Sequence, residues 1–448
     1  MHSSKVLRAL VAAGLCTAGV APARADAQAE RLQALEKRLE SSVQLIDRLS
    51  ARIAELERGA KPAPAAAAPA APVATAAQAQ TITALQESVS QLSASLSRRG
   101  SDTGLPLHGF ADVGAAWSSG NDPVKLRGFN GGTLDLYLTP QFGERVKGLV
   151  EIALEYGDDG GLAVDLERLQ LGYTVSDALT VWLGRFHTPF GIWNTAYHHG
   201  ANLQASIFRP RFIDFEDKGG VIAAHSVGAW ASGKMPLGAG RLTYDAYIAN
   251  GPRIAGRTLD FNAFNDDGSN KLVGVNLGYQ PAGALAGLSV GVHAFGAQAK
   301  VYDDKAAVLS ETRLRMAGAY VGYDEDDWEL MGEYYHFANL DLGANRRHAS
   351  DAGFVQLGKT LGAWTPFVRW EKAAFDPADN YFRSQASGRS YRRAVLGLRY
   401  ALDPNSSFKF EFGATREGAS DLIDETGALQ SLPAGSYRRA AFQYSVAF

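Results

Sequence analysis

The sequence is poor in cysteine and in long apolar runs. The 448-residue chain has one cysteine, Cys16, and no run of 18 consecutive apolar residues. Without a second thiol, the chain cannot form an internal disulfide. A transmembrane helix needs about 18 to 20 apolar residues in sequence, so none is available. If the protein lies in a membrane, it must cross it as a closed sheet, which satisfies its backbone hydrogen bonds internally.

A strong excess of one charge is also missing. The chain has 44 Lys and Arg residues against 47 Asp and Glu residues, a formal net charge of −3. Removal of residues 1–25 would take away three cations and no acid, so the net charge would fall from −3 to −6. A mildly acidic chain argues against nucleic acid as a partner. The hydrophobic content of 46% excludes wholesale disorder.

The first 25 residues predict a secretory signal peptide. Lys5 and Arg8 precede an uncharged run at 9–23, and "ARADA" supplies a small-x-small cleavage pattern after Ala25. A lipoprotein signal at Cys16 is the alternative, but Leu15 stands where a small residue would be needed. We therefore expect the protein to be exported.

Apolar residues recur at every third or fourth position within 26–58. They are Leu32, Leu35, Leu39, Ile46, Leu49, Ile53 and Leu56. With charged and polar residues around them, they predict a coiled coil about 48 Å long. One amphipathic helix that packs on its own protein is the alternative reading.

Two further segments precede the remainder of the chain. Residues 59–80 are rich in Pro and Ala without a period, which predicts an extended linker that spans at most about 70 Å. Residues 81–100 carry a second, short heptad pattern, which predicts another coiled-coil helix. Two self-associating segments indicate an oligomer, and heptads this mixed leave dimer and trimer both open.

From residue 107 onward, apolar and polar residues alternate. Sixteen such segments are bounded by turn residues, and they predict strands. They lie near 107–117, 133–140, 146–156, 163–174, 179–187, 225–234, 240–250, 271–280, 287–297, 313–323, 328–337, 351–361, 364–372, 391–401, 407–415 and 437–448. The connections alternate between long and short, and aromatic residues such as Trp117 and Trp364 fall near the segment ends. These features are typical of transmembrane barrels.

The predicted fold class is therefore all-β. We expect a 16-stranded antiparallel transmembrane β-barrel over residues 105–448, preceded by the α-helical coiled coil. Lipid of an outer membrane would surround this barrel.

Specific stretches resemble a known family. The signal peptide, the sixteen-strand pattern and the final "AFQYSVAF" resemble a Gram-negative outer-membrane porin, and the coiled coil is similar to that of the DcaP-type porins. The stretch "LGRFHTPFGIWN" looks like the "LGRFKxPFG" stretch of phosphate-selective porin O and P relatives. The resemblance implies a homotrimer of water-filled channels, and it implies that the barrel-assembly machinery recognises Phe448.

The polar positions of the strands predict a charged lumen. Acids predominate on the early and middle strands, and bases on the last four. The basic positions are Arg369, Arg393, Arg399, Lys409 and Arg439. Two opposed charged walls would favour dipolar or small charged solutes. The alternative is that these charges are solvated strand faces held in ion pairs.

The longest connection, at 188–224, is predicted to fold inward and form a constriction. Its aromatic residues are too many for a loop free in water; they are Phe190, Trp193, Tyr197, Phe208, Phe212 and Phe215. Arg209 and Arg211 present two guanidinium groups suited to bind an anion, and Asp214 and Glu216 follow them. The alternative is that both arginines bind Asp214, Glu216 or carboxylates of the wall.

The sequence thus predicts an outer-membrane porin for passive diffusion of small hydrophilic solutes, with small anions preferred. We expect no cofactor, metal or catalytic residue. His187, His198 and His199 lack a matched set of further ligands. His225 and Ser226 are adjacent in a strand and point to opposite faces, so they cannot act as base and nucleophile. The alternative function is a structural anchor whose coiled coil binds the cell wall or a periplasmic partner.

Overall fold

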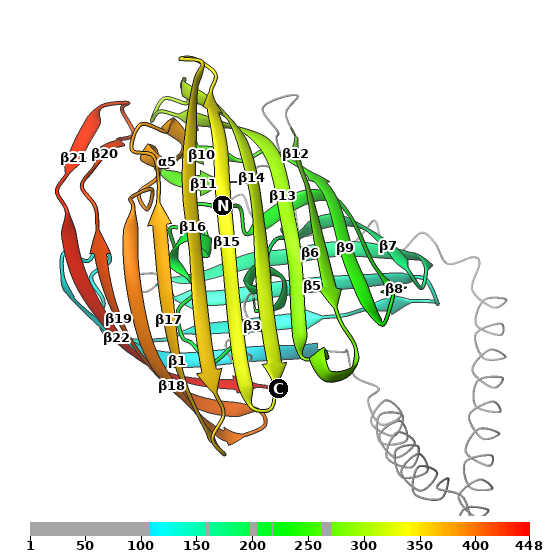
Figure 1. Ribbon diagram of the computed structural model, residues 1–448. Helices are drawn as coiled ribbons and strands as arrows, with labels where there is room; N and C mark the ends of the chain where they lie inside the picture. Colours follow the sequence, from blue (N-terminus) through cyan, green and yellow to red (C-terminus); the bar gives the residue numbers. More distant parts are fainter. Residues whose placement is uncertain (1–106, 157–160, 198–203, 217, 261–270) are drawn as a thin grey trace, which may run out of the picture. The chain divides into compact units, whose positions relative to one another are not determined.

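The computed structural model describes residues 107–156, 161–197, 204–216, 218–260 and 271–448. They form a closed sheet of sixteen wall strands (Figure 1). The last strand pairs with the first, from Phe110 opposite Ala447 to Gly120 opposite Tyr437. The predicted 16-stranded barrel is confirmed. The signal peptide, the coiled coil at 26–58, the linker at 59–80 and the helix at 81–100 lie outside the described residues.

Each predicted strand corresponds to one wall strand. In chain order these are β1 (Leu107–Gly120), β3 (Thr133–Leu138), β5 (Val146–Tyr156), β6 (Leu162–Ser176), β7 (Leu179–His187), β8 (His225–Leu237), β9 (Gly240–Ala249), β12 (Leu272–Gln280), β13 (Leu288–Tyr302), β14 (Val308–Glu325), β15 (Trp328–Asp341), β16 (Arg346–Lys359), β17 (Trp364–Ala374), β18 (Tyr391–Asp403), β19 (Ser406–Glu417) and β22 (Gly435–Ala447). Neighbouring wall strands are antiparallel.

Short elements occupy the connections. They are β2 (Arg127–Asn130), β4 (Gln141–Phe142), α4 (Trp193–Ala196), η1 (Arg211–Ile213), β10 (Arg253–Ala255), β11 (Thr258–Asp260), η2 (Gly283–Leu285), α5 (Asn380–Arg383), β20 (Ser420–Ile423) and β21 (Leu429–Leu432). Figure 1 shows β20, β21, α5, β10 and β11 at the end of the barrel opposite the carboxyl terminus. No helix among the described residues is long and apolar enough to cross a membrane.

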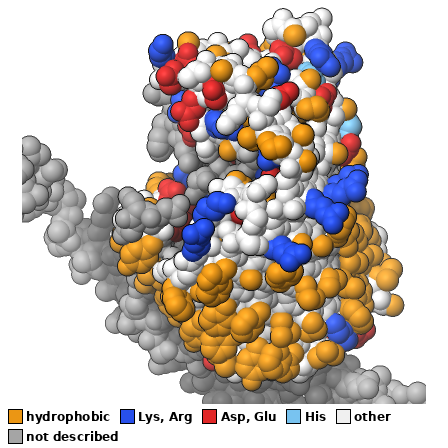
Figure 2. Space-filling model, turned by 90° about the vertical axis from the view of Figure 1, so that its left-hand side faces the viewer, with side chains coloured by type: hydrophobic (Ala, Val, Ile, Leu, Met, Phe, Trp, Pro, Cys, Tyr) orange, Lys and Arg blue, Asp and Glu red, His pale blue; other side chains and the backbone are white. Residues whose placement is uncertain are grey.

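The wall strands place their apolar side chains outward. In β12, for example, Val273, Val275 and Leu277 are exposed, whereas Asn276 between them is buried. A strand in a soluble sheet would bury its apolar face against the core, so this arrangement is inverted. Figure 2 shows hydrophobic side chains gathered on the lower part of the wall, at the end where the carboxyl terminus lies. Alternation in the sequence therefore reflects an apolar solvent outside the sheet.

The predicted alternation of long and short connections fails at more than one position, and the clearest case is the hairpin between β13 and β14. The connection 281–287, at the end that holds the carboxyl terminus, has 7 residues, and the next connection, 303–307, has only 5. β14 has 18 residues and extends beyond the predicted 313–323. The outward positions at the predicted start are Arg313 and Arg315, so the apolar pattern ends there while the hydrogen-bonded ladder continues back to Val308. Residues expected in a loop instead lengthen the hairpin.

The hydrophobic core lies inside the barrel. Phe190, Trp193 and Phe212 of the connection 188–224 are buried against Tyr335 and Phe354 of the wall. Aromatic rings of this size bury enough area to dominate local packing, and their edge-to-face contacts add a further preference for this geometry. The described residues of this connection, 188–197, 204–216 and 218–224, are called the inward loop below. The prediction that its aromatics pack on the inner wall is confirmed.

Candidate functional site

The inward loop starts with a turn fixed by a wall carboxylate. Glu333 of β15 accepts hydrogen bonds from the backbone N–H groups of Ile192, at 3.0 Å, and Trp193, at 2.6 Å. Gly191 just before them has φ +61°, and a Cβ there would lie 2.0 Å from a Glu333 carboxylate oxygen. Only glycine combines this backbone conformation with so close an approach. Glu333 therefore determines where the loop enters the lumen.

Two more wall carboxylates bind the middle of the loop in the same way. Glu411 of β19 accepts from the N–H groups of Ile207, at 2.8 Å, and Phe208, at 3.1 Å. Glu371 of β17 accepts from the N–H of Arg211 at 2.9 Å. A buried N–H without a partner costs about 1 to 3 kcal/mol, so these contacts satisfy groups that an irregular loop would otherwise leave unpaired. The wall thereby replaces secondary structure as the loop's hydrogen-bond partner.

The same carboxylates are balanced by arginines from neighbouring strands. Arg369 lies 2.9 Å from Glu371 and 3.6 Å from Glu411, and it also donates to Gln356 at 3.1 Å. Arg393 lies 3.8 Å from Glu371 and 3.4 Å from Glu411. All four charged side chains are buried under the loop. Since each acid faces two guanidinium groups and a loop backbone, the cluster is a closed network.

Arg209 and Arg211, the predicted anion-binding pair, are both bound within the protein. Arg209 is 4% exposed and donates to the carbonyl of Ile213, at 3.0 Å, and to the side chain of Asn194, at 2.8 Å. Burial lowers the pKa of the Arg209 guanidinium, although Asp214 and Glu216 act in the opposite direction. Arg211 pairs with Glu417 of β19 at 2.5 Å. The sequence left two roles open for these arginines, anion binding and contact with protein carboxylates. The structure shows both bound to protein groups, and for Arg211 the group is a wall carboxylate.

The remaining predicted bases lie in separate places. Lys409 is fully buried and donates to the carbonyl of Ser206 at 3.3 Å. Arg439 binds both carboxylate oxygens of Asp122, at 2.7 Å each, and so holds the connection between β1 and β3. Arg399 on β18 is half-buried, and the charge of Glu329 acts on it. The last four strands therefore do carry inward bases, but most of them hold a loop.

A cavity of about 680 Å³ lies on the other side of the inward loop, against β1, β3 and β5. Asp214 of the predicted set lines it, together with Asp112 and Asp135 of the wall. Lys125 and Arg127, in the connection between β1 and β3, also line it and are exposed. A mixed charged lining of this kind stays hydrated, so polar solutes can enter it.

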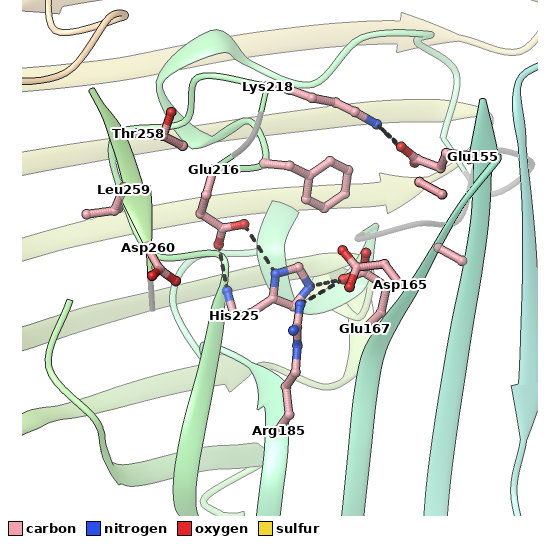
Figure 3. A pocket seen from close by; sticks show the side chains of 13 residues that line it. Glu155, Asp165, Glu167, Arg185, Glu216, Lys218, His225, Thr258, Leu259 and Asp260 are labelled. Carbon is pink, nitrogen blue, oxygen red and sulfur yellow. Dashed lines mark hydrogen bonds and ion pairs between the residues drawn. The ribbon is translucent and has the colours of Figure 1, made fainter. Parts of the chain in front are cut away.

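A smaller cavity of about 270 Å³ adjoins the loop near β6 and β8 (Figure 3). Figure 3 shows the His225 ring between Glu216 of the loop and Glu167 of β6, at 3.3 and 2.7 Å, with Arg185 approaching Glu167. Lys218 pairs with Glu155 at 3.0 Å. Glu216, a predicted site residue, thus ties the end of the loop to the wall. Within the part of the chain described, no cluster of His, Cys, Asp and Glu suits a metal ion.

The sequence did not reveal the loop-binding acids as such. Glu333, Glu371 and Glu411 have the parity of lumen residues, which strand alternation identifies. Their role depends on partners 140 to 204 residues away in the chain. Asn194, whose amide donates to the carbonyls of Thr188 and Ala224 at 2.9 Å each, gave no signal at all.

Similar folds occur among solved protein structures. No family model and no curated protein matches the sequence. The structure is similar to an anion-selective porin from Comamonas acidovorans, with a TM-score of 0.51 and 14% identity over 77% of this chain and 99% of that chain. The outer membrane channel DcaP of Acinetobacter baumannii gives a TM-score of 0.48 and 13% identity, over 77% and 97% of the two chains. At such identities a likeness shows the fold alone, and the chain has the sixteen-stranded barrel fold of the outer-membrane porins.

Proposed function

We propose that this protein is an outer-membrane porin through which small hydrophilic solutes diffuse passively. The observation that carries the proposal is the cavity of about 680 Å³ between the inward loop and β1, β3 and β5. Its lining contains four acids and four bases. Charges of both signs on facing surfaces keep water in the cavity and disfavour apolar solutes. The apolar outer face of the wall supports the placement in a membrane.

Small anions are the charged class that we propose, but on other residues than the sequence indicated. Arg209 and Arg211 are engaged by protein groups. Lys125 and Arg127 are exposed in the same cavity, and no hydrogen bond or ion pair joins either to a carboxylate of the described residues. These two cations are therefore able to attract an anion from solution.

The test is the single-channel conductance of the purified protein in a planar bilayer, with the reversal potential measured in a salt gradient. Large, stable, stepwise conductance is expected, with a reversal potential that indicates anions. A cation-selective channel would overturn the anion part of the proposal and leave the porin. Correctly folded protein without conductance would overturn the porin itself and favour the structural anchor.

Export, assembly and the oligomer complete the proposal. The signal peptide at 1–25 would direct export, Phe448 would be recognised by the barrel-assembly machinery, and three copies would associate. The coiled coils would stabilise that trimer and could contact the cell wall or a periplasmic protein. Deletion of 26–100 is expected to leave the barrel inserted but to lower the temperature at which the oligomer dissociates on a gel. Unchanged heat resistance would contradict the role of the coiled coils.

A further inference from the structure

Four cations lie on the outer face of the wall, where lipid is expected. They are Lys372 on β17, Arg392 on β18, Arg416 on β19 and Arg438 on β22, which we call the cation row. All four are exposed, and each alternates with buried, inward residues. Lys372 is directly opposite Arg392, and Arg392 is directly opposite Arg416. Arg438 is opposite Ala414, two positions from Arg416, so the row crosses four adjacent strands with one offset.

The row lies at the edge of the apolar part of the wall. An aromatic residue stands eight positions away from the cation on each of three strands: Trp364 on β17, Tyr400 on β18 and Phe408 on β19. These three aromatics are also opposite one another in the sheet. Eight residues span about 26 Å along a strand, or about 20 Å across the membrane at a tilt near 40°. An apolar band is about 25 Å tall, so the guanidinium groups reach its far edge.

The outward positions between the three aromatic residues and the cations are apolar. On β18 they are Leu398, Leu396 and Ala394, and on β19 they are Phe410, Phe412 and Ala414. Figure 2 faces this side of the barrel and shows the hydrophobic lower surface with Lys and Arg side chains above it. On this side of the barrel, an apolar surface therefore lies directly below a cationic one (Figure 2).

The cations have little within the protein to balance them. No hydrogen bond or ion pair links any of the four to another residue in the described ranges. The charge of Asp351 acts on Lys372, but Asp351 already accepts hydrogen bonds from Tyr334 and His336. Like charges directly opposite each other in a sheet are destabilising. An external anion beside a row of three such neighbours would offset this repulsion.

We propose that the cation row binds the phosphate groups of an anionic lipid in the leaflet on the side of the long connections. The phosphates would lie against Arg392 and Arg416, whose guanidinium groups bind phosphate in a bidentate manner, and Lys372 and Arg438 would flank them. The acyl chains would lie along the apolar positions of β17, β18 and β19. This inference rests on the membrane placement in the proposed function and adds a specific lipid site to it.

The experiment compares two charge-matched variants of the full-length protein in detergent. Arg392→Gln with Arg416→Gln removes the centre of the row. Arg313→Gln with Arg315→Gln removes two exposed cations of β14, a strand outside the row. Lipid binding is titrated with diphosphoryl lipid A, with phosphatidylcholine as the uncharged control, by native mass spectrometry. Cations near an anionic surface contribute about fivefold each, so the row variant is expected to lose affinity for lipid A by tenfold or more. The β14 variant is expected to bind within about twofold of wild type.

Four results would overturn the lipid site. One is an equal loss in both variants, which would mean general attraction by charge. Another is equal binding of lipid A and phosphatidylcholine by the wild type. The third is a row variant that loses oligomers in the absence of lipid, which would assign the row to contact with a second copy of the chain. The fourth is that inorganic phosphate alone raises the temperature of the gel shift as much as lipid A does. That result would also contradict a site that needs acyl chains.

Folding and function are read separately. The heat-modifiable gel shift shows whether each variant forms the barrel, and Arg392→Lys with Arg416→Lys keeps the charge if the Gln variant does not fold. Retention of lipid A binding within about threefold by the Lys variant is expected, and its complete loss would contradict a charge-based site. Conductance is measured on the same samples. Loss of conductance in the wild type would defeat the proposed porin while the lipid titration still decides the site.

Discussion

The two halves of the barrel interior use the same residue types for opposite purposes. Under the inward loop, Arg369, Glu371, Arg393 and Glu411 are buried and bind one another. Across the cavity, Asp112, Glu155 and Lys218 line a space open to solvent. Strand alternation is identical in the two halves, so an inward charge does not by itself indicate a channel. Whether a loop covers the charge decides between a structural role and contact with solute.

Removal of a carboxylate should show the largest difference in stability between the two halves of the interior. Glu371→Ala leaves Arg369 and Arg393 buried with one acid fewer, and loss of one partner in a buried pair costs about 3 to 5 kcal/mol. We expect a lower unfolding temperature on a gel and a larger, noisier conductance as the loop detaches. The matched control, Glu155→Ala, breaks the partly exposed pair with Lys218, which is worth about 1 kcal/mol or less. Equal losses in the two variants would contradict the contrast between the halves.

The arginine pair of the loop gives the next effect. Arg209→Ala with Arg211→Ala removes contacts to Asn194, Ile213 and Glu417. Hydrogen bonds to charged groups contribute about 1.5 to 3 kcal/mol, so destabilisation of the loop by about 3 kcal/mol is expected. Conductance fluctuations should rise. A clean shift of the reversal potential toward cations, with a quiet channel, would instead mean that the two guanidinium groups face the solute.

A substitution at the start of the inward loop is expected to cost less stability than the two changes above. Gly191→Ala forces a Cβ against the carboxylate of Glu333 and adds strain at φ +61°. About 2 kcal/mol is expected, seen as a shift in the denaturation midpoint and as a wider channel. Gly238→Ala is the control, because Gly238 has φ +57° but no atom within 4 Å of its Cβ position, so it reports strain alone. If both variants lose the same stability, the contact with Glu333 is unimportant.

Substitutions in the half of the interior that contains the larger cavity should have the smallest effect on stability. Lys125→Gln with Arg127→Gln changes exposed side chains, so stability should change by about 0.5 kcal/mol or less. The reversal potential in a salt gradient should move toward cations. An unchanged potential would remove these two residues from the selectivity of the channel. Arg346→Gln with Arg347→Gln, exposed in the hairpin between β15 and β16, gives the same charge change as a control.

The wall was predictable from the sequence because its outer face is apolar. Outward residues such as Val273 and Val275 must be apolar, so each strand carries its own signature within a few residues. At the start of β14 the outward residues Arg313 and Arg315 replace the apolar signature, and the predicted strand begins at Arg313 although the observed one begins at Val308. The inward packing of the loop was predictable from its aromatics. Which acid meets which arginine was not, because those pairs join strands and loop across long stretches of chain.

The binding of the inward loop also sets an order for folding. The N–H groups of Ile207 and Arg211 reach Glu411 and Glu371 across 204 and 160 residues of chain. Contacts at such separation form late, because the intervening chain must be ordered first. The loop can therefore dock only after β17 and β19 have joined the sheet. Until then its aromatic residues stay exposed, and this is the interval in which a chaperone would recognise the chain and in which aggregation competes with assembly.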